Sequence, residues 1–341
     1  MIYKPALAYN DVLLVPKYSD IVSRKEVDIS SALDSTRTLR LPIISSPMDT
    51  ITESSMANCM ATAGGLGVIH RYNSIEIQAQ QAYQVTTPER KAAAIGITSD
   101  YLERAQALYE VGVRILCLDV AHGHHILMKK AIENLKSLYS DIHVMAGNVA
   151  TQSAFEDLAS WGADSIRCNI GGGSICSTRI QTGHGVPGLQ TIFDCFSANV
   201  KRDVKIIADG GIRNSGDIVK ALAAGADFVM VGSLLAGTIE TPGDIIYASG
   251  GSRRKIYRGM ASKEAQHEWR GRHSSNEGIS TTVPLKGTAG GILDQLENGI
   301  RSGLSYSGAR NLTELQVNAD FIVQSSSGQL ESGTHILSRN Q

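Results

Sequence analysis

The segment HVMAGNVATQSAFEDLASWGADSIRCNI, residues 143–170, contains the unit from which the fold is predicted. An apolar run at His143–Ala150 is followed by an amphipathic stretch at Thr151–Trp161 and by a second apolar run at Ser165–Ile170. Near-continuous apolar runs that alternate with helical stretches are typical of parallel strands buried on both faces. The segment therefore predicts a strand, a helix and a parallel strand.

The same alternation continues in both directions along the chain. Six further apolar runs occur at Leu41–Ser46, Gly65–His70, Ala92–Ile97, Ile115–Ala121, Val204–Gly211 and Phe228–Gly232. Helical candidates between the runs include Tyr101–Val111, His125–Tyr139 and Ser215–Ala224. Eight such units predict an α/β fold, a closed (β/α)8 TIM barrel, with a doubly wound open sheet as the alternative. We interpret residues 1–341 as one barrel domain.

The composition excludes several classes of protein. The chain has 341 residues and a formal net charge of −1, which argues against a broad basic surface for nucleic acid. No apolar run approaches the length of a membrane span, and Met1–Pro5 lacks the apolar core of a signal peptide. The five cysteines form no C-x-x-C pair and no evident disulfide framework. We therefore expect a reducing, cytoplasmic location.

A glycine-rich loop, Gly171–Arg179, follows the second run of the opening segment and presents Cys176. Three consecutive glycines permit backbone angles that a Cβ would forbid and let the chain pass close to a ligand. The thiol lies beside two hydroxyls and a guanidinium. A flexible connector with an incidental cysteine is the alternative. Because the loop leaves a predicted strand, we interpret it as facing a ligand.

Polar groups gather where the predicted strands end. Active sites of (β/α)8 barrels lie at the C-terminal ends of the strands. These ends carry Ser45–Asp49, His70-Arg71, Asp119–Gly123, Gly147-Asn148, Asp209–Gly211 and Gly232-Ser233. The last two lie where the loops after strands seven and eight often bind phosphate. We therefore predict a phosphorylated substrate, with tight turns as the alternative explanation of these glycines.

Eight motifs, in order along nearly the whole chain, resemble the IMP dehydrogenase/GMP reductase family. They are Asp11–Pro16, Ser46–Thr50, Gly147–Val149, Gly173–Arg179, Ala208–Ile212, Val231–Ser233, Tyr257–Met260 and Gly299–Gly303. The resemblance implies a (β/α)8 barrel, a purine nucleotide at the strand ends, a nicotinamide cofactor and a homotetramer. It also implies that Cys176 attacks C2 of the purine, a reaction suited to a thiolate nucleophile.

The resemblance assigns roles to further residues. Thr178 and Glu277 are implied as catalytic groups that move protons beside the cysteine. The implied substrate-binding residues are Ser46, Ser174, Asp209, Gly211, Gly232, Ser233, Tyr257, Gly259 and Met260, with Asp209 on the ribose hydroxyls. The implied cofactor-binding residues are Asp119, Val120, Ala121, Asn148, Arg270 and Arg272. For the two arginines, a solvated surface is the alternative.

The resemblance also implies a K+ ion held by the backbone carbonyls of Gly171, Gly173 and Cys176. The family usually has Gly-Ile-Gly-Pro-Gly in this loop, where the present chain has Asn169-Ile170-Gly171-Gly172-Gly173. The loop before Cys176 therefore departs from the family pattern at two positions. Both departures bear on the cation site and on the rigidity of the loop, because glycine is less restrained than proline.

Two opposite reactions occur on this scaffold in the family. IMP dehydrogenase uses NAD and activates water with an Arg-Tyr pair on a mobile flap, whereas GMP reductase uses NADPH and releases ammonia. Here the flap, residues 261–277, contains no Arg-Tyr dipeptide, and the direct connection from His70 to Ala92 leaves no room for paired regulatory domains. We predict a GMP reductase. An IMP dehydrogenase, which the motif Tyr257–Met260 resembles more closely, and a silent nucleotide-binding barrel are the alternatives.

Two remaining segments have simpler interpretations. His122, His124 and His125 cluster after a predicted strand, but no carboxylate partner is evident, so we favour a role without metal, with His122 near the nicotinamide. The tail at 311–341 is rich in Ser, Gly, Gln and Asn, and we expect part of it to be mobile.

Overall fold

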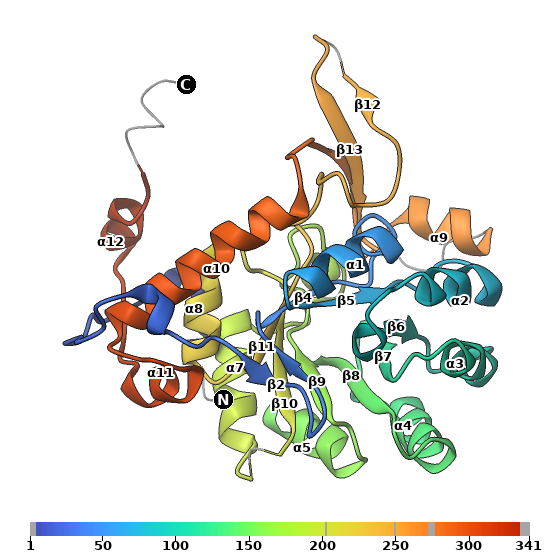
Figure 1. The fold of residues 1–341 in the computed structure, drawn as a ribbon, viewed down its shortest axis with the longest axis horizontal. Helices are drawn as coiled ribbons and strands as arrows, with labels where there is room; N and C mark the ends of the chain where they lie inside the picture. The colour runs from blue at the N-terminus through green and yellow to red at the C-terminus, as the bar shows by residue number, and fades with distance from the viewer. Residues whose placement is uncertain (1–4, 202, 249, 272–276, 335–341) are drawn as a thin grey trace.

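Eight parallel strands close into a barrel (Figure 1). The structure is a computed structural model that describes residues 5–201, 203–248, 250–271 and 277–334. The barrel strands are β4 (Ile43–Ser45), β5 (Leu66–Ile69), β6 (Ala92–Ile95), β7 (Ile115–Asp119), β8 (His143–Val149), β9 (Ser165–Cys168), β10 (Lys205–Asp209) and β11 (Phe228–Val231). They pair in chain order, and β11 pairs with β4 to close the ring. Each predicted apolar run contains one of these strands, so the (β/α)8 barrel is confirmed.

Helices cover the outside of the barrel. They are α1 (Ser54–Thr62), α2 (Ile75–Tyr83), α3 (Tyr101–Glu110), α4 (Ile126–Leu138), α5 (Gln152–Ser160), α7 (Gly188–Ala198), α8 (Ser215–Ala223) and α10 (Ala289–Tyr306). Several begin at a side-chain cap, as when Thr151 accepts the N–H of Ala154 and Asn214 accepts that of Asp217. Such caps satisfy an N–H group that has no partner within the helix. The four helices predicted by residue range are present as α3, α4, α5 and α8.

Alternate side chains of the strands fill the barrel interior. On β7, Ile115 and Cys117 join the interior cluster, whereas Leu116 and Leu118 pack with the surrounding helices. This alternation follows from the two-residue period of a strand. Burial raises the pKa of the Cys117 thiol to about 12, so Cys117 is a core group.

A short hairpin closes the N-terminal end of the barrel. Its strands are β2 (Ser31–Ala32) and β3 (Thr38–Leu39), and Leu33 and Leu39 join the interior cluster. In its turn, Asp34 Oδ2 lies 3.1 Å from Nδ1 of His143, the first residue of β8. The hairpin is therefore tied to the barrel by apolar packing and by a polar contact.

Further elements lie outside the barrel. They are β1 (Val12–Leu14), α6 (Thr178–Thr182), β12 (Ile246–Tyr247), β13 (Arg253–Arg258), α9 (Lys263–Arg270), β14 (Ser280–Pro284), α11 (Leu312–Asn318), β15 (Phe321–Val323), α12 (Ser326–Glu331) and 3-10 helices at Tyr9–Asp11, Arg24–Glu26 and Pro88–Arg90. Strands β12 and β13 project from the body of the molecule (Figure 1). Strand β1 pairs with β15, which joins the two ends of the chain. Much of the tail predicted to be partly flexible thus forms α11, β15 and α12, whereas 335–341 lie outside the described residues.

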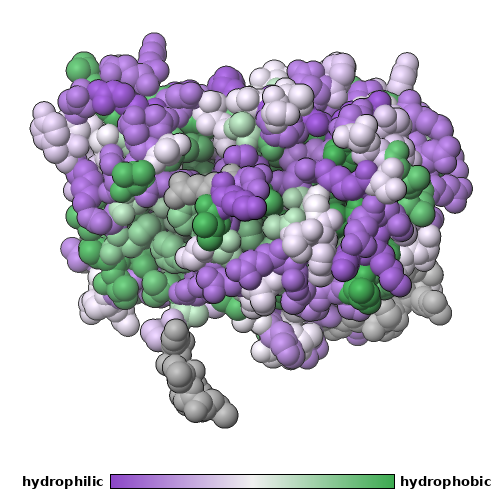
Figure 2. Space-filling model, turned by 90° about the horizontal axis from the view of Figure 1, so that it is seen from below, coloured by the Kyte–Doolittle hydropathy of each residue, from purple (hydrophilic) through white to green (hydrophobic). Residues whose placement is uncertain are grey.

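The surface of the molecule carries many polar residues (Figure 2). Within the described ranges, no helix combines the length and the apolar character needed to cross a bilayer. Hydrophilic residues cover much of the face in Figure 2, and the broadest apolar area lies on its left side.

Candidate active site

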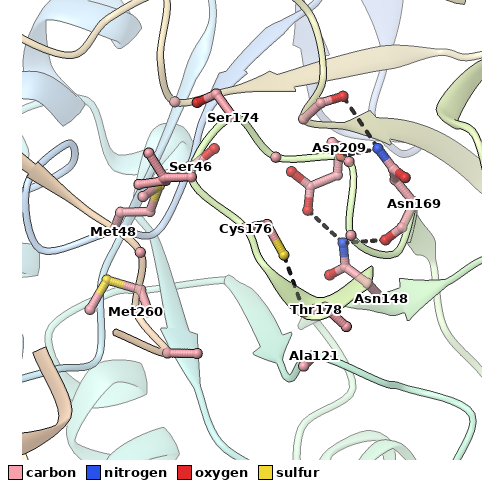
Figure 3. Close-up of a pocket in the computed structure, with 18 of the residues that line it drawn as sticks. Ser46, Met48, Ala121, Asn148, Asn169, Ser174, Cys176, Thr178, Asp209 and Met260 are labelled. Atoms are coloured by element: carbon pink, nitrogen blue, oxygen red, sulfur yellow. Dashed lines mark hydrogen bonds between the residues drawn. The ribbon is translucent and has the colours of Figure 1, made fainter. Parts of the chain in front are cut away.

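A pocket of about 270 Å³ opens at the C-terminal ends of the barrel strands (Figure 3). It brings together eighteen of the twenty predicted site residues, namely Ser46, Asp119, Val120, Ala121, Asn148, Gly171, Gly173, Ser174, Cys176, Thr178, Asp209, Gly211, Gly232, Ser233, Tyr257, Gly259, Met260 and Glu277. Arg270 ends α9, but the structure does not describe its side chain, and Arg272 lies outside the described residues. The sequence-based prediction thus converges on one cavity.

A chain of three polar groups runs through the reactive part of the pocket. Cys176 Sγ lies 3.2 Å from Thr178 Oγ1, and the Thr178 hydroxyl donates to Glu277 Oε2 at 2.8 Å. Because that hydroxyl proton points to Glu277, its oxygen can accept the thiol proton. The arrangement can therefore carry a proton from the thiol to the carboxylate and return it.

Backbone contacts hold this chain of groups together. The N–H of Cys176 donates to the carbonyl of Gly173 at 3.1 Å, and the N–H of Ser177 donates to the carbonyl of Glu277 at 3.0 Å. Cys176 also forms an antiparallel bridge with Gly278. These bonds fix the Cys176 loop against a segment about a hundred residues later in the chain, which explains how Thr178 and Glu277 meet.

A second group, of polar and charged side chains, surrounds Asp209. Asn148 Nδ2 donates to Asp209 Oδ2 at 2.7 Å, and Arg167 bridges Asp209 and Asp119 with contacts of 2.8 and 2.6 Å. Burial by itself would lower the pKa of Arg167, but the carboxylates of Asp209 and Asp119 raise it well above its usual value. Arg167 therefore stays charged and orients both carboxylates. The sequence reasoning missed it, although a charge inside the apolar run Ser165–Ile170 was the available signal.

A cradle of small groups forms another wall. Ser174 Oγ lies 3.2 Å from the Tyr257 hydroxyl, and burial raises the pKa of Tyr257. A Cβ added at Gly232 would lie 3.2 Å from Met48 Sδ and 3.4 Å from the Tyr257 hydroxyl. A side chain at position 232 would thus fill the cradle. Hydroxyl groups and exposed backbone suit a phosphate group, which accepts several hydrogen bonds at once.

Arg71 and Tyr72, from the loop after β5, line the side of the pocket near Asp119 and contact α9. Arg71 Nη2 donates to the carbonyl of Asp119 at 3.1 Å. The Trp269 ring of α9 lies 4.7 Å from the Tyr72 ring, centroid to centroid, and the Arg71 guanidinium lies 5.5 Å from the Trp269 ring centroid. The sequence pattern placed Arg71 among the polar groups at the strand ends without a specific role, and it did not single out Tyr72. Their side chains link the pocket wall near Asp119 to α9, none of whose described residues lines the pocket itself.

The predicted metal and histidine features can also be located. His124 Nε2 lies 2.7 Å from Asp157 Oδ2, so the expectation that these histidines lack a carboxylate partner was wrong, because α5 brings Asp157 beside them. Burial together with His124 and His125 lowers the pKa of His122, which does not line the pocket. Among the described residues, no group of three His, Cys, Asp or Glu side chains is placed to hold a metal ion. The carbonyls of Gly171, Gly173 and Cys176 belong to one loop, and carbonyl oxygens are suitable donors for a monovalent cation.

Comparisons with known proteins assign the chain to a family. A model of the IMP dehydrogenase / GMP reductase domain matches residues 6–335. The chain is 33% identical to an inosine-5'-monophosphate dehydrogenase of Nitrosopumilus maritimus, over 98% of this chain and 99% of the relative. It is 38% identical to the enzyme of the same name from Cryptosporidium parvum, over 96% and 94% of the two chains.

A solved structure supports the same assignment. A GMP reductase variant of Trypanosoma brucei, in complex with guanosine 5'-monophosphate, superposes with a TM-score of 0.92 at 30% identity and covers 98% of each chain. The chain therefore belongs to the IMP dehydrogenase/GMP reductase family, oxidoreductases that act on the purine mononucleotides IMP or GMP with a nicotinamide cofactor.

Proposed function

We propose that this protein is a GMP reductase, which converts GMP and NADPH into IMP, ammonia and NADP+. The observation that carries the proposal is the Cys176–Thr178–Glu277 chain of hydrogen-bonded groups, which can deliver a proton to a leaving amine. The absence of an Arg-Tyr dipeptide from residues 261–277 supports it, because a reductase has no hydrolysis step that needs an activated water.

The proposed reaction uses Cys176 as the nucleophile. A bond forms between Sγ and C2 of the guanine while the thiol proton passes through Thr178 to Glu277. Glu277 returns a proton through Thr178 to the 2-amino group, the C2–N bond breaks, and ammonia leaves. When bound, the nicotinamide cofactor supplies the hydride that C2 receives. The Sγ–C2 bond then breaks, which releases IMP and regenerates the thiolate.

The remaining pocket residues fit the parts of the two ligands. We propose that Asp209 holds the ribose hydroxyls and that Ser174, Gly211, Gly232, Ser233 and Tyr257 bind the 5'-phosphate. Ser46, Gly259 and Met260 would contact the base or sugar, and Asp119, Val120, Ala121 and Asn148 the nicotinamide half of the cofactor. Arg270 and Arg272 stay candidates for a cofactor phosphate. A K+ ion on the Cys176 loop, a homotetramer and a single catalytic domain over 1–341 complete the proposal.

An IMP dehydrogenase is the second candidate. The curated relatives quoted above carry that name. In addition, Arg71 and Tyr72 line the pocket beside Asp119. They supply a guanidinium and a phenol, the two groups of the Arg-Tyr pair that the flap lacks. In this case one of these two groups would activate the water that hydrolyses the Cys176 adduct of IMP.

A paired absorbance assay at 340 nm distinguishes the candidates. One reaction contains GMP and NADPH, and the other contains IMP, NAD and K+. Loss of NADPH with release of ammonia supports the reductase. Formation of NADH with production of XMP overturns it in favour of the dehydrogenase. Silence in both reactions, with nucleotide binding intact, indicates a binding protein or another purine nucleotide as substrate. Cys176→Ala should abolish whichever turnover is found.

A further inference from the structure

Asn169 has an unusual position directly after β9. It is 3% exposed, and its φ of 156° lies in the region that favours glycine. Glycine is also the residue that the family pattern predicts here. A buried side chain in a conformation that disfavours it requires a compensating contact. Asn169 must therefore make contacts that a glycine could not make.

Those contacts join the two loops that carry the central groups of the pocket. Asn169 Nδ2 donates to the carbonyl of Asp209 at 3.0 Å and lies 3.4 Å from the carbonyl of Gly210. The backbone carbonyl of Asn169, which a glycine would also have, accepts from Asn148 Nδ2 at 3.0 Å, and the same Asn148 amide donates to the Asp209 carboxylate (Figure 3). Asp209 is thus fixed through its backbone by one amide and through its side chain by another.

The Asn169 amide also packs against Gly172 in the Cys176 loop. A Cβ added at Gly172 would lie 2.1 Å from Asn169 Nδ2, far inside van der Waals contact. A Cβ added at Gly211 would lie 3.0 Å from the carbonyl of Gly172, so the loops after β9 and β10 touch at their glycines. The amide therefore occupies the space into which a side chain at position 172 would project.

This packing explains both departures from the family pattern together. The family usually has glycine where this chain has Asn169, and proline where it has Gly172. A proline at 172 would collide with the Asn169 amide, whereas the φ of Gly172 itself is negative and does not require glycine. Proline restrains a loop by its ring. The buried Asn169 amide can restrain it instead by packing against Gly172 while its hydrogen bonds hold it to the Asp209 loop. Arg179 Nη2 also lies 3.5 Å from Asn169 Oδ1.

We propose that Asn169 is a positioning residue that replaces this proline and fixes the Cys176 loop against the Asp209 loop. Asn169 thereby sets the position of the thiol relative to the nucleotide. The proposal rests on the proposed function only in taking a purine nucleotide as the ligand. It holds for GMP and for IMP alike, because Cys176 would attack C2 in both.

A double-mutant cycle tests the proposal with Asn169→Gly, Gly172→Pro and the double variant. The readouts are kcat and KM for the nucleotide, and the rate at which iodoacetamide alkylates Cys176. We expect Asn169→Gly to lower kcat about tenfold with a smaller effect on KM, because the misplaced thiol still binds its nucleotide. Gly172→Pro alone should lower kcat at least as much. The double variant should return to within about threefold of the wild type.

Two outcomes would overturn the proposal. One is a value of kcat for Asn169→Gly within twofold of the wild type. The other is a double variant no more active than the worse single variant. If Gly172→Pro does not fold, the comparison of Asn169→Gly with the double variant still decides. A double variant that is more active than Asn169→Gly shows that proline at 172 restores the position of the loop once the Asn169 amide is gone.

A control separates positioning from stability. Among the non-glycine residues that the structure describes, Ser99 is the other one with a positive φ, which is 59°. Ser99 does not line the pocket, and Ser99→Gly relieves its strain. Thermal unfolding of Ser99→Gly and Asn169→Gly compares the change in stability on relieving strain outside the pocket with the change at Asn169. If the wild type turns over neither nucleotide, the proposed function fails. The alkylation rates across the cycle then still test Asn169, with restored wild-type reactivity in the double variant as the expected result.

Discussion

At the scale of single residues, burial distinguishes the five cysteines. Cys117, Cys168 and Cys195 are buried. Burial raises the pKa of Cys117 and Cys168, which makes their thiolates rare at neutral pH. Burial and the neighbouring Glu240 also raise the pKa of the half-buried Cys59. Cys176 instead faces the pocket next to Thr178, so it is the thiol expected to react.

This difference predicts selective alkylation. At neutral pH, iodoacetamide should modify Cys176 at least about tenfold faster than Cys59, because the thiolate is the reactive form. Peptide mass spectrometry over a time course measures both rates. Saturating GMP or IMP should protect Cys176 and leave the rate at Cys59 unchanged. Equal rates at the two cysteines would contradict the assignment of the nucleophile.

The Thr178 hydroxyl gives a second prediction at this scale. Thr178→Val keeps the shape of the side chain but removes the group between Cys176 and Glu277. We expect kcat to fall by about 10²–10⁴, the usual contribution of general acid–base catalysis. Thr178→Ser, which restores the hydroxyl, should recover most of the activity. Steady-state kinetics of the two variants provide the test, and a small loss in Thr178→Val would exclude a proton relay.

At the scale of elements, α9 is attached to the loops beside the pocket by contacts at both ends. Ser262 caps its first turn by accepting the N–H of Ala265. Arg258, at the end of β13, pairs with Glu268 of α9 and with Asp49, so it links the helix to the loop after β4. Trp269 contacts Arg71 and Tyr72. The flap predicted at 261–277 thus includes a helix with defined attachments.

Trp269 predicts how α9 affects the cofactor. Trp269→Ala should raise KM for the nicotinamide cofactor by about threefold to tenfold. This factor corresponds to the interaction free energy of one aromatic pair. KM for the purine nucleotide should change little, because Trp269 reaches the pocket only through Arg71 and Tyr72, on the side near Asp119. Trp269→Phe is the matched control and should retain most of the affinity. Initial rates at varied cofactor concentration decide the matter.

The elements differ in how well the sequence could predict them. Strands β4 to β11 were predictable because buried parallel strands leave continuous apolar runs. Strand β13, Arg253–Arg258, was not predicted, because a polar strand at the surface leaves no such run. The meeting of Thr178 and Glu277 came from the resemblance, since no local pattern relates residues so far apart. The Asn169 contacts depend on the packing of two loops, which a linear sequence does not display.

At the scale of the whole molecule, the hairpin of β2 and β3 contributes to stability in a pH-dependent way. Burial alone would raise the pKa of Asp34, but hydrogen bonds from His143 and Thr36, together with Arg37, hold it below its ordinary value of 3.8. A carboxyl group with a depressed pKa in the folded state stabilises the protein at pH values above its unfolded pKa. That contribution is lost as the pH falls through the folded pKa.

Asp34→Asn tests this contribution. At pH 7 we expect the free energy of unfolding to fall by about 1 kcal/mol, because Asp34 is only half-buried and solvent screens its charged hydrogen bonds. The difference from the wild type should narrow below about pH 4, where Asp34 of the unfolded chain becomes protonated. Urea unfolding at several pH values measures it. A difference that stays constant from pH 7 down to pH 3 would show that the charge of Asp34 is not responsible.

The pairing of β1 with β15 determines how the molecule responds to a pulling force. The two strands are antiparallel, with Val12 opposite Val323 and Leu14 opposite Phe321. Tension applied at the two chain ends enters the pair at the same edge, between Val12 and Val323, and loads its hydrogen bonds one after another. The ends should therefore peel apart at low force in an optical-tweezers experiment. The barrel, whose parallel strands bear the load together in shear, should unravel only in a later step.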